Sequence, residues 1–204
     1  MLTMNSFAFD FTKHNLVQIV DSEHIVLDIK YATKDNFMHK VLYPNSNAYL
    51  HKDTYLLLLQ ATERLTKHNK EHNTNYKLKI WDAFRPYSIQ VELYKSVQGT
   101  PQQIYVSNPE KGDAAHTRGT AIDLTIVDAH GKELDMGTEF DNFTEKAHRD
   151  AFGKKLITKK QEQNRQLLNF AMGDSFVGYS AEWWHFNLPM TDENNLKYPK
   201  IKDL

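Results

Sequence analysis

Four side chains have the types and the spacing of a hydrolytic metal site. His116 and Asp123 stand seven residues apart in AAHTRGTAIDL, and Glu182 and His185 stand three residues apart in EWWHF. A catalytic zinc takes three protein ligands and keeps a fourth position for water, while a nearby carboxylate that does not bind the metal removes the proton of that water. The sequence therefore predicts one Zn²⁺ per chain, held by His116, Asp123 and His185. Glu182 is then the candidate general base.

The residues around the first pair favour this interpretation. Gly119 lies between the two candidate ligands, where the backbone needs a sharp turn, and AIDLTIV then has the composition of a strand. In a strand, Ile122 and Leu124 share one face and Asp123 points to the other, so that its carboxylate can reach a cleft. His116 and Asp123 alone would also fit a structural pair, because the chain has 10 histidines and 26 acidic residues.

The second pair raises a geometric problem. In a regular strand, Glu182 and His185 would point to opposite faces, because side chains alternate along the strand. A bulge or a turn must therefore bring them together if both assignments are correct.

Five segments occur in a recognisable order along about three quarters of the chain. They are YATKDNF from Tyr31 to Phe37, WDAFRP from Trp81 to Pro86, HTRGTAIDLT from His116 to Thr125, DMGTEFD from Asp135 to Asp141, and EWWHF from Glu182 to Phe186. With these segments the chain resembles the D-alanyl-D-alanine dipeptidases of the VanX type. These are zinc peptidases related to the D,D-carboxypeptidases and to the hedgehog signalling domain.

The resemblance implies the same metal site and adds a substrate. It implies zinc on His116, Asp123 and His185, Glu182 as general base, and Arg85 as the group that stabilises the transition state. The implied reaction is hydrolysis of the small molecule D-Ala-D-Ala to two D-alanines.

Arg85 stands immediately before Pro86, at a predicted corner between a strand and a helix. The residue before a proline is pushed out of helical geometry, so the direction of Arg85 is partly set by the backbone. A guanidinium held there can face the oxyanion that forms when water attacks a peptide carbonyl. The alternative is an arginine that packs on Trp81 or pairs with Asp82.

Four further residues are candidates for substrate binding. A carboxylate at Asp141 beside the cleft would favour a free ammonium and reject a blocked one, although a solvated turn residue is the alternative. Tyr31, Asn36 and Phe37 match the YAT-x-x-NF pattern of the family and are expected to line the pocket, or else to be plain core residues.

One position departs from the family pattern. Its members usually carry serine two residues before the first metal histidine, whereas this chain has Ala114. If the serine hydroxyl helps to hold the dipeptide, this chain lacks a hydrogen bond of about 0.5–1.5 kcal/mol. Substrate strictness is therefore left open.

Strands and helices are expected to mix without a regular βαβ alternation. Alternating apolar residues predict half-buried strands over 25–29 and 77–84. The stretch 98–115 is rich in Gly, Pro, Asn and Asp and is expected to be a loop that forms a wall of the site.

Three helices are predicted. The first runs from Asp53 to about His68, the second follows Pro86, and the third begins with a capping box of Thr158 and Gln161 and stops at Gly173. We expect one α+β domain over 1–204, with a mainly antiparallel sheet that carries the zinc site. The polar residues from about 190 to 204 are expected to be a surface tail.

Composition limits the classes of partner. A net charge of −1 gives no electrostatic reason to expect nucleic acid or a membrane as partner. The chain has no cysteine, so any metal site rests on histidine and carboxylate. Neither a signal peptide nor an 18-residue apolar stretch is visible, which indicates a cytoplasmic protein. The oligomeric state is left open.

Three alternatives remain at this point. A D,D- or L,D-carboxypeptidase would use the same zinc site on the end of a peptidoglycan stem peptide, and it would accept N-acylated substrates. A non-catalytic binding module would keep the zinc for stability, although such a site has no need of Glu182. Co, Mn or Ni can also occupy sites of histidine and carboxylate. The biological role, either glycopeptide resistance or cell-wall turnover, is left open.

Overall fold

A five-stranded sheet lies at the centre of the computed structural model, which describes residues 10–202. Its strands follow the order β2 (Ile25–Leu27), β4 (Lys77–Asp82), β5 (Ala121–Val127), β7 (His185–Asn187) and β6 (Val177–Gly178). Only the β2–β4 pair of this sheet is parallel. Strands β1 (Leu16–Ile19) and β3 (Ala48–His51) form a separate antiparallel pair. The predicted α+β fold with a largely antiparallel sheet is confirmed.

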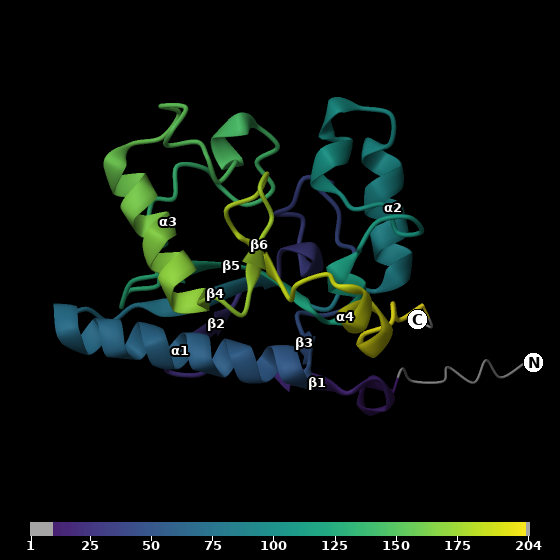
Figure 1. Ribbon diagram of the computed structural model, residues 1–204, viewed down its shortest axis with the longest axis horizontal. Coiled ribbons are helices and arrows are strands. Elements are labelled where there is room, and N and C mark those ends of the chain that lie inside the picture. The colour runs from purple at the N-terminus through teal and green to yellow at the C-terminus, as the bar shows by residue number, and fades with distance from the viewer. Residues whose placement is uncertain (1–9, 203–204) are drawn as a thin grey trace, which may run out of the picture.

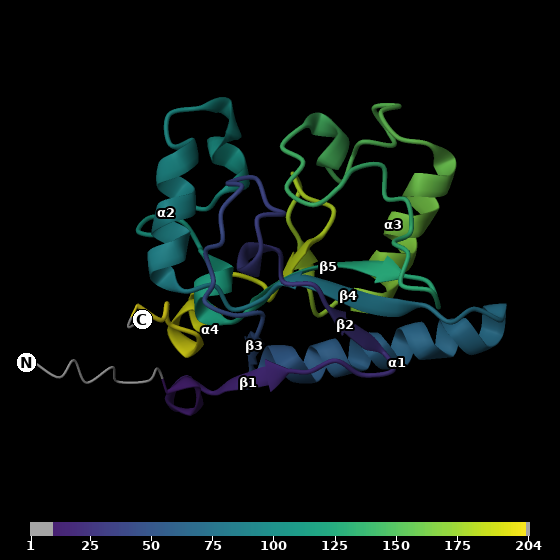
Figure 2. The same cartoon turned by 180° about the vertical axis from the view of Figure 1, so that it is seen from behind.

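Within the described part of the chain, four α-helices surround the sheets. They are α1 (Lys52–His72), α2 (Tyr87–Val97), α3 (Lys159–Met172) and α4 (Asp192–Lys197). Short 3-10 helices are η1 (Phe11–His14), η2 (Lys30–Ala32), η3 (Pro101–Tyr105), η4 (Ala115–Arg118) and η5 (Glu145–Ala147). Helix α1 runs along the long axis of the molecule. Helices α3 and α2 lie toward opposite ends of the molecule, on the left and on the right of Figure 1. From behind, β1 lies beside α1 (Figure 2). Within residues 10–202, no helix is both long and apolar enough to cross a bilayer.

The predicted helix ends agree with their capping chemistry. Thr158 and Gln161 form the expected capping box at the start of α3, and Gly173 follows its last residue with φ of 71°. Helix α1 is about one turn longer than predicted, because Asn73 ends it in the left-handed conformation that short polar side chains tolerate. Pro86 stands one residue before α2, as its N-cap.

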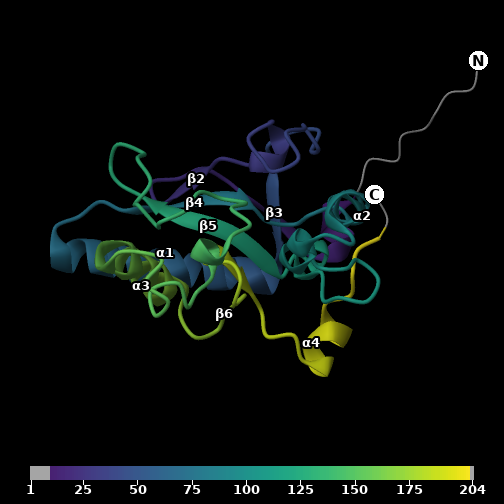
Figure 3. The ribbon, with the colours of Figure 1, turned by 90° about the horizontal axis from the view of Figure 1, so that it is seen from above.

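Strand β5 pairs with β4 on one side and with β7 on the other, and all seven of its residues are buried. Figure 3 shows β2, β4 and β5 side by side in this sheet. On β4, Leu78 and Ile80 are fully buried while Lys77 and Lys79, which alternate with them, are partly exposed, as the alternation predicted. The burial of β5 on both faces places the Asp123 carboxylate inside the protein. A buried carboxylate is costly unless opposite charges, hydrogen bonds or a metal compensate for the lost hydration.

The chain after Met190 differs from the predicted surface tail, because it packs onto the body of the protein. Residues 192–197 form α4, and Tyr198 and Ile201 are each only 5% exposed. The Tyr198 hydroxyl donates to Asp53 at 2.8 Å. Lys200 donates to the carbonyls of the wall loop at 109–112. Two isolated apolar residues in a polar stretch are too weak a pattern to predict this docking. Residues 203–204 of the expected tail lie outside the described residues.

Candidate active site

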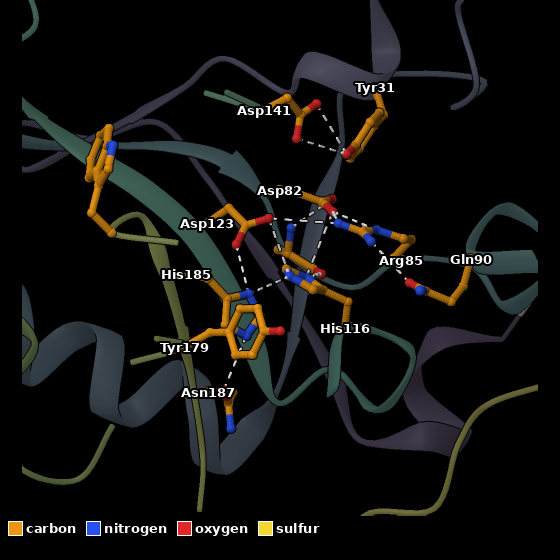
Figure 4. Close-up of polar contacts among 12 residues, drawn as sticks. Tyr31, Asp82, Arg85, Gln90, His116, Asp123, Asp141, Tyr179, His185 and Asn187 are labelled. Carbon is orange, nitrogen blue, oxygen red and sulfur yellow. Dashed lines mark hydrogen bonds and ion pairs between the residues drawn. The ribbon is translucent and has the colours of Figure 1, made fainter. Parts of the chain in front are cut away.

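His116, Asp123 and His185 converge on one point (Figure 4). The His116 Nε2 atom lies 3.2 Å from His185 Nδ1 and 3.3 Å from Asp123 Oδ2, and His185 Nδ1 lies 2.9 Å from Asp123 Oδ1. They come from η4, β5 and β7. Asp123 and His185 stand opposite each other in the register of β5 and β7, so the sheet itself brings these two together.

The donor atoms fit a metal ion. Two ligand atoms that each lie ~2.1 Å from a tetrahedral zinc are ~3.4 Å apart, close to the separations found here. The outward ring nitrogens also have acceptors. His116 Nδ1 lies 2.6 Å from the Ala83 carbonyl, and His185 Nε2 lies 3.1 Å from Asn187 Oδ1. With protons on these outward nitrogens, the inward nitrogens present lone pairs to a cation.

The pKa shifts of Asp123 and His185 also favour the binding of a metal ion. Burial favours the neutral form of Asp123, but the nearby His116 and His185 outweigh it and hold the pKa of the carboxyl well below its ordinary value. Burial lowers the pKa of His185, which favours the neutral ring that a metal requires. The site therefore offers a carboxylate at Asp123 and a neutral imidazole at His185.

The turn between His116 and Asp123 requires glycine. Gly119 has φ of +67°. A Cβ atom there would lie 2.6 Å from Leu16 Cδ2 and 2.8 Å from the backbone nitrogen of His51. Both the conformation and the close packing against β1 and β3 exclude a side chain. The sequence expectation of a sharp turn at this position is confirmed.

Glu182 solves the geometric problem of the EWWHF segment by lying outside a strand. It belongs to the turn over 179–184 that joins β6 to β7, and its side chain lines the same cavity as the three candidate ligands. Glu182 is only 7% exposed. Burial raises the pKa of its carboxyl well above the ordinary value, and the negative charges of Asp123 and Asp141 add to the effect.

Arg85 pairs with Asp82 and also faces the cavity. Its Nε and Nη2 atoms donate to Asp82 Oδ2 at 2.9 and 2.7 Å, and Nη1 donates to Gln90 Oε1 at 2.9 Å. Nη2 lies 3.7 Å from Asp123 Oδ2, which places the guanidinium beside the candidate metal ligands. The two interpretations of Arg85 drawn from the sequence are therefore compatible. Gln90, which also donates to the Ser107 carbonyl, was not predicted.

Asp141 lines the cavity beside Tyr31 and lies above the candidate metal ligands in the view of Figure 4. Its carboxylate accepts hydrogen bonds from the Tyr31 hydroxyl and from the backbone N–H of Phe37, each at 3.3 Å. Burial raises the pKa of Asp141 to about 7. A group with these contacts is not a solvated turn residue.

The structure separates the three residues of the YAT-x-x-NF pattern. Tyr31 lines the cavity with Asp141. The Asn36 side-chain amide donates to three backbone carbonyls of its own loop, and Phe37 packs against Phe143. Asn36 and Phe37 line a neighbouring hollow that shares only Asp141 with the cavity. They shape the loop that holds Asp141 in place.

The cavity has a volume of about 190 Å³. Pockets for drug-sized ligands are typically ~300–1,000 Å³, so this one suits a smaller molecule. The loop over 98–115 forms one wall, as predicted. Cavity residues outside this loop that the sequence interpretation missed are Gln90, Phe143, Tyr179, Trp184, Asn187 and Met190. No local spacing distinguishes these residues from core aromatics or ordinary polar residues.

Ala114 contributes to the same wall. It adopts a left-handed conformation with φ of 45°, and its N–H donates to the Ser107 hydroxyl at 3.0 Å. Ser107 also lines the cavity. The wall therefore has a serine hydroxyl next to Ala114, although it comes from another position in the chain.

Comparisons with known proteins agree with this geometry. A family model for peptidase M15, described as D-ala-D-ala dipeptidase, matches residues 12–202. A D-alanyl-D-alanine dipeptidase of Escherichia coli (strain K12) is 38% identical over 178 residues, which are 87% of this chain and 83% of that protein. Proteins of the same name from Enterococcus faecalis (strain ATCC 700802 / V583) and Enterococcus faecium are 32% and 33% identical over 79% of this chain and 84% of each relative.

The family match covers every residue of the site described above, and the relatives align over most of their own length. The family is one of metallopeptidases, which agrees with the convergence of two histidines and an aspartate in the cavity. The chain therefore belongs to the peptidase M15 family of D-ala-D-ala dipeptidases, and it is an enzyme.

Proposed function

We propose that this enzyme hydrolyses free D-Ala-D-Ala to two molecules of D-alanine, with one Zn²⁺ held by His116, Asp123 and His185. The observation that carries the proposal is the lining of one small cavity. The three candidate ligands, Glu182 and Asp141 all face the same space of about 190 Å³. The names of the relatives supply the substrate.

Zinc suits two imidazole nitrogens and a carboxylate that leave a position open to the cavity. When bound, the ion would polarise the substrate carbonyl and make water acidic enough to act as a nucleophile near neutral pH. His116 and His185 would bind through Nε2 and Nδ1 respectively, since these are the atoms that face the common point. Ala83 and Asn187 would hold the two rings in that orientation.

Glu182 is the proposed general base. It removes a proton from the attacking water as the new C–O bond forms at the peptide carbonyl. It then passes that proton to the leaving amine as the C–N bond breaks. Its raised pKa favours the return of the proton to the leaving amine, and the positive charge of a bound Zn²⁺ would favour the ionised form that accepts the proton.

Arg85 is the proposed partner of the developing oxyanion. Asp82 and Gln90 together bind three of its nitrogens, so the guanidinium does not have to be reorganised during the reaction. The Tyr31 ring lies 5.1 Å from the guanidinium carbon and limits its movement on the other side.

Asp141 is the proposed site for the free ammonium of the dipeptide. A charge-assisted hydrogen bond to this half-buried carboxylate would stabilise a substrate with a free amine. An N-acylated substrate would place a neutral amide there and would lose that bond. The proposal therefore favours a dipeptidase over a carboxypeptidase that acts on longer stem peptides.

A panel of three substrates tests the proposal. Purified, zinc-loaded protein is incubated with D-Ala-D-Ala, N-acetyl-D-Ala-D-Ala and L-Ala-L-Ala, and the release of alanine is measured. We expect rapid cleavage of D-Ala-D-Ala alone. Equal cleavage of the acetylated compound would identify a carboxypeptidase and overturn the role of Asp141. Failure to cleave any of the three by protein with bound metal would overturn the proposed function.

A further inference from the structure

Glu182 and His185 reach the same cavity only because the turn over 179–184 has a particular shape. Its internal backbone hydrogen bonds are long, at 3.2 Å from Glu182 N–H to the Tyr179 carbonyl and 3.4 Å from Tyr179 N–H to the His185 carbonyl. Strand β6, which leads into the turn, has only two residues. Contacts from elsewhere in the chain must therefore define the shape of this turn.

Arg149 supplies several of these contacts. Its Nε atom donates to the Tyr179 carbonyl at 3.0 Å. Its Nη2 atom donates to the carbonyls of Trp183 and His185 at 3.1 and 2.8 Å. Its backbone N–H donates to the Ser180 carbonyl at 2.9 Å. One residue thus binds carbonyls at both ends of the turn and inside it.

The rest of the Arg149 side chain is also constrained. Nη1 donates to the Asn169 side-chain amide oxygen at 2.7 Å, which ties the guanidinium to α3. The guanidinium carbon lies 4.4 Å from the centre of the Phe186 ring on β7. Its acceptors are three carbonyls and one amide rather than carboxylates. Burial lowers the pKa of Arg149 to about 10, so the side chain stays charged at neutral pH.

Gly178 leaves space for this guanidinium. A Cβ atom built on Gly178 would overlap the Arg149 side chain at its guanidinium carbon. The last residue of β6 is therefore matched to the arginine that crosses over it. The segment around Arg149 and the turn after β6 lie side by side near the centre of Figure 1.

We propose that Arg149 is a positioning residue that holds Glu182 and His185 in the orientation used for catalysis. Arg149 itself does not line the cavity, so it acts through the turn. The inference rests on the proposed function, because it takes Glu182 as the base and His185 as a metal ligand. A planar guanidinium is needed, because the compact ammonium of lysine cannot reach all of the acceptors, which are the carbonyls of Tyr179, Trp183 and His185 and the Asn169 amide on α3.

The test compares Arg149→Lys with Arg64→Lys. Arg64 is a matched control, because it also donates to two backbone carbonyls, those of Ala171 and Met172, and also packs over a glycine, Gly173. Its guanidinium hydrogen bonds hold the end of α3 rather than the turn over 179–184. Both changes remove guanidinium hydrogen bonds to backbone carbonyls, but only the first removes them from the turn.

For Arg149→Lys we expect kcat for D-Ala-D-Ala to fall about 10- to 100-fold with KM little changed, because displacement of a reacting group by ~1 Å can cost ~10²-fold. Arg64→Lys should lose thermal stability while it keeps the wild-type kcat. Millimolar guanidinium should restore part of the kcat of Arg149→Ala and none to Arg64→Ala. A wild-type kcat in Arg149→Lys, or an equal loss in both lysine variants, overturns the inference.

A second set of measurements does not depend on turnover. Co²⁺ is loaded into each variant, and the visible absorption of the ion reports the geometry of its ligands. Amide hydrogen exchange is measured over 179–184. Arg149→Lys and Gly178→Ala should change the Co²⁺ spectrum and speed exchange in the turn, whereas Arg64→Lys should do neither. If the wild type releases no D-alanine, the proposed function fails, and these spectra still decide whether Arg149 orders the turn.

Discussion

Asp82 and Arg85 form a buried ion pair in which one carboxylate oxygen, Oδ2, accepts from both Nε and Nη2 of the guanidinium. The other oxygen, Oδ1, accepts from the Tyr43 hydroxyl at 2.7 Å and from the Ala83 N–H at 2.9 Å. The Ala83 carbonyl in turn accepts a hydrogen bond from His116 Nδ1. A single fully buried aspartate at the end of β4 thus connects the guanidinium to the backbone that orients a candidate metal ligand.

Arg85→Lys should lower kcat for D-Ala-D-Ala by about 10²–10³, as removal of an oxyanion donor does in other hydrolases. Lysine keeps the positive charge but cannot bind both Asp82 and Gln90 and still face the cavity. The change should leave metal content at the wild-type level, which metal analysis of the same samples checks. A kcat within twofold of the wild type would contradict the role of Arg85.

Glu182→Gln should keep the metal and lose about 10²–10⁴ in kcat, the usual contribution of a general base. The amide has nearly the same shape as the carboxylate but cannot accept the proton of water. His116→Ala is the comparison, because it should lose both the metal and the activity. Substantial turnover by Glu182→Gln would remove this residue from the mechanism.

Asp141 should make KM for the free dipeptide depend on pH. With its pKa at about 7, the carboxyl is neutral below that pH and charged above it, so KM should rise as pH falls through about 7. The substrate amine has a pKa of ~7.7–8.0 and loses its charge above that range. KM should therefore be lowest between about 7 and 8.

The control for this profile is Asp141→Asn. Its KM should be higher near pH 7.5 and should lose the rise on the acid side, because asparagine does not titrate. Steady-state kinetics from pH 5.5 to 9 measures both profiles. If KM rises equally at low pH in the wild type and in Asp141→Asn, a group other than Asp141 causes the pH dependence of KM.

Gly119→Ala should destabilise the fold more than Gly131→Ala does. Both glycines have positive φ, at +67° and +80°, so both changes carry a strain of roughly 1–2 kcal/mol. Only at Gly119 does the new Cβ also collide with Leu16 and the His51 backbone, whereas at Gly131 it meets nothing within 4 Å. Overpacking typically adds about 1–3 kcal/mol.

Urea unfolding of the two glycine variants measures this difference. We also expect Gly119→Ala to bind metal more weakly, since the turn sets the distance between His116 and Asp123. Equal losses of unfolding free energy in the two variants would mean that the backbone near Gly119 moves aside easily.

The sequence was most informative where chemistry and local geometry agree. The spacing of His116, Gly119 and Asp123 predicted a turn into a strand, and the capping box at Thr158 predicted the start of α3; both are present. The placement of Glu182 in a turn was only one of two possibilities, because side-chain alternation excludes a regular strand but does not choose between a bulge and a turn.

Long-range contacts could not be predicted in this way. Arg149 is an ordinary charged residue in sequence, and its role depends on carbonyls 30–36 positions away. The docking of Tyr198 and Ile201 similarly depends on a surface formed by η4 and α1. Such contacts follow from the folded topology, whereas periodicity reports only which face of one element is apolar.

The most direct test of the central claim is a metal titration of activity. Metal-free protein, prepared with a chelator, is given increasing equivalents of Zn²⁺, and D-alanine release from D-Ala-D-Ala is followed at each step. We predict that activity is absent at the start, rises in proportion to added zinc and reaches its plateau at one equivalent per chain. Full activity without metal, or no activity once one equivalent is bound, would contradict the proposed zinc dipeptidase.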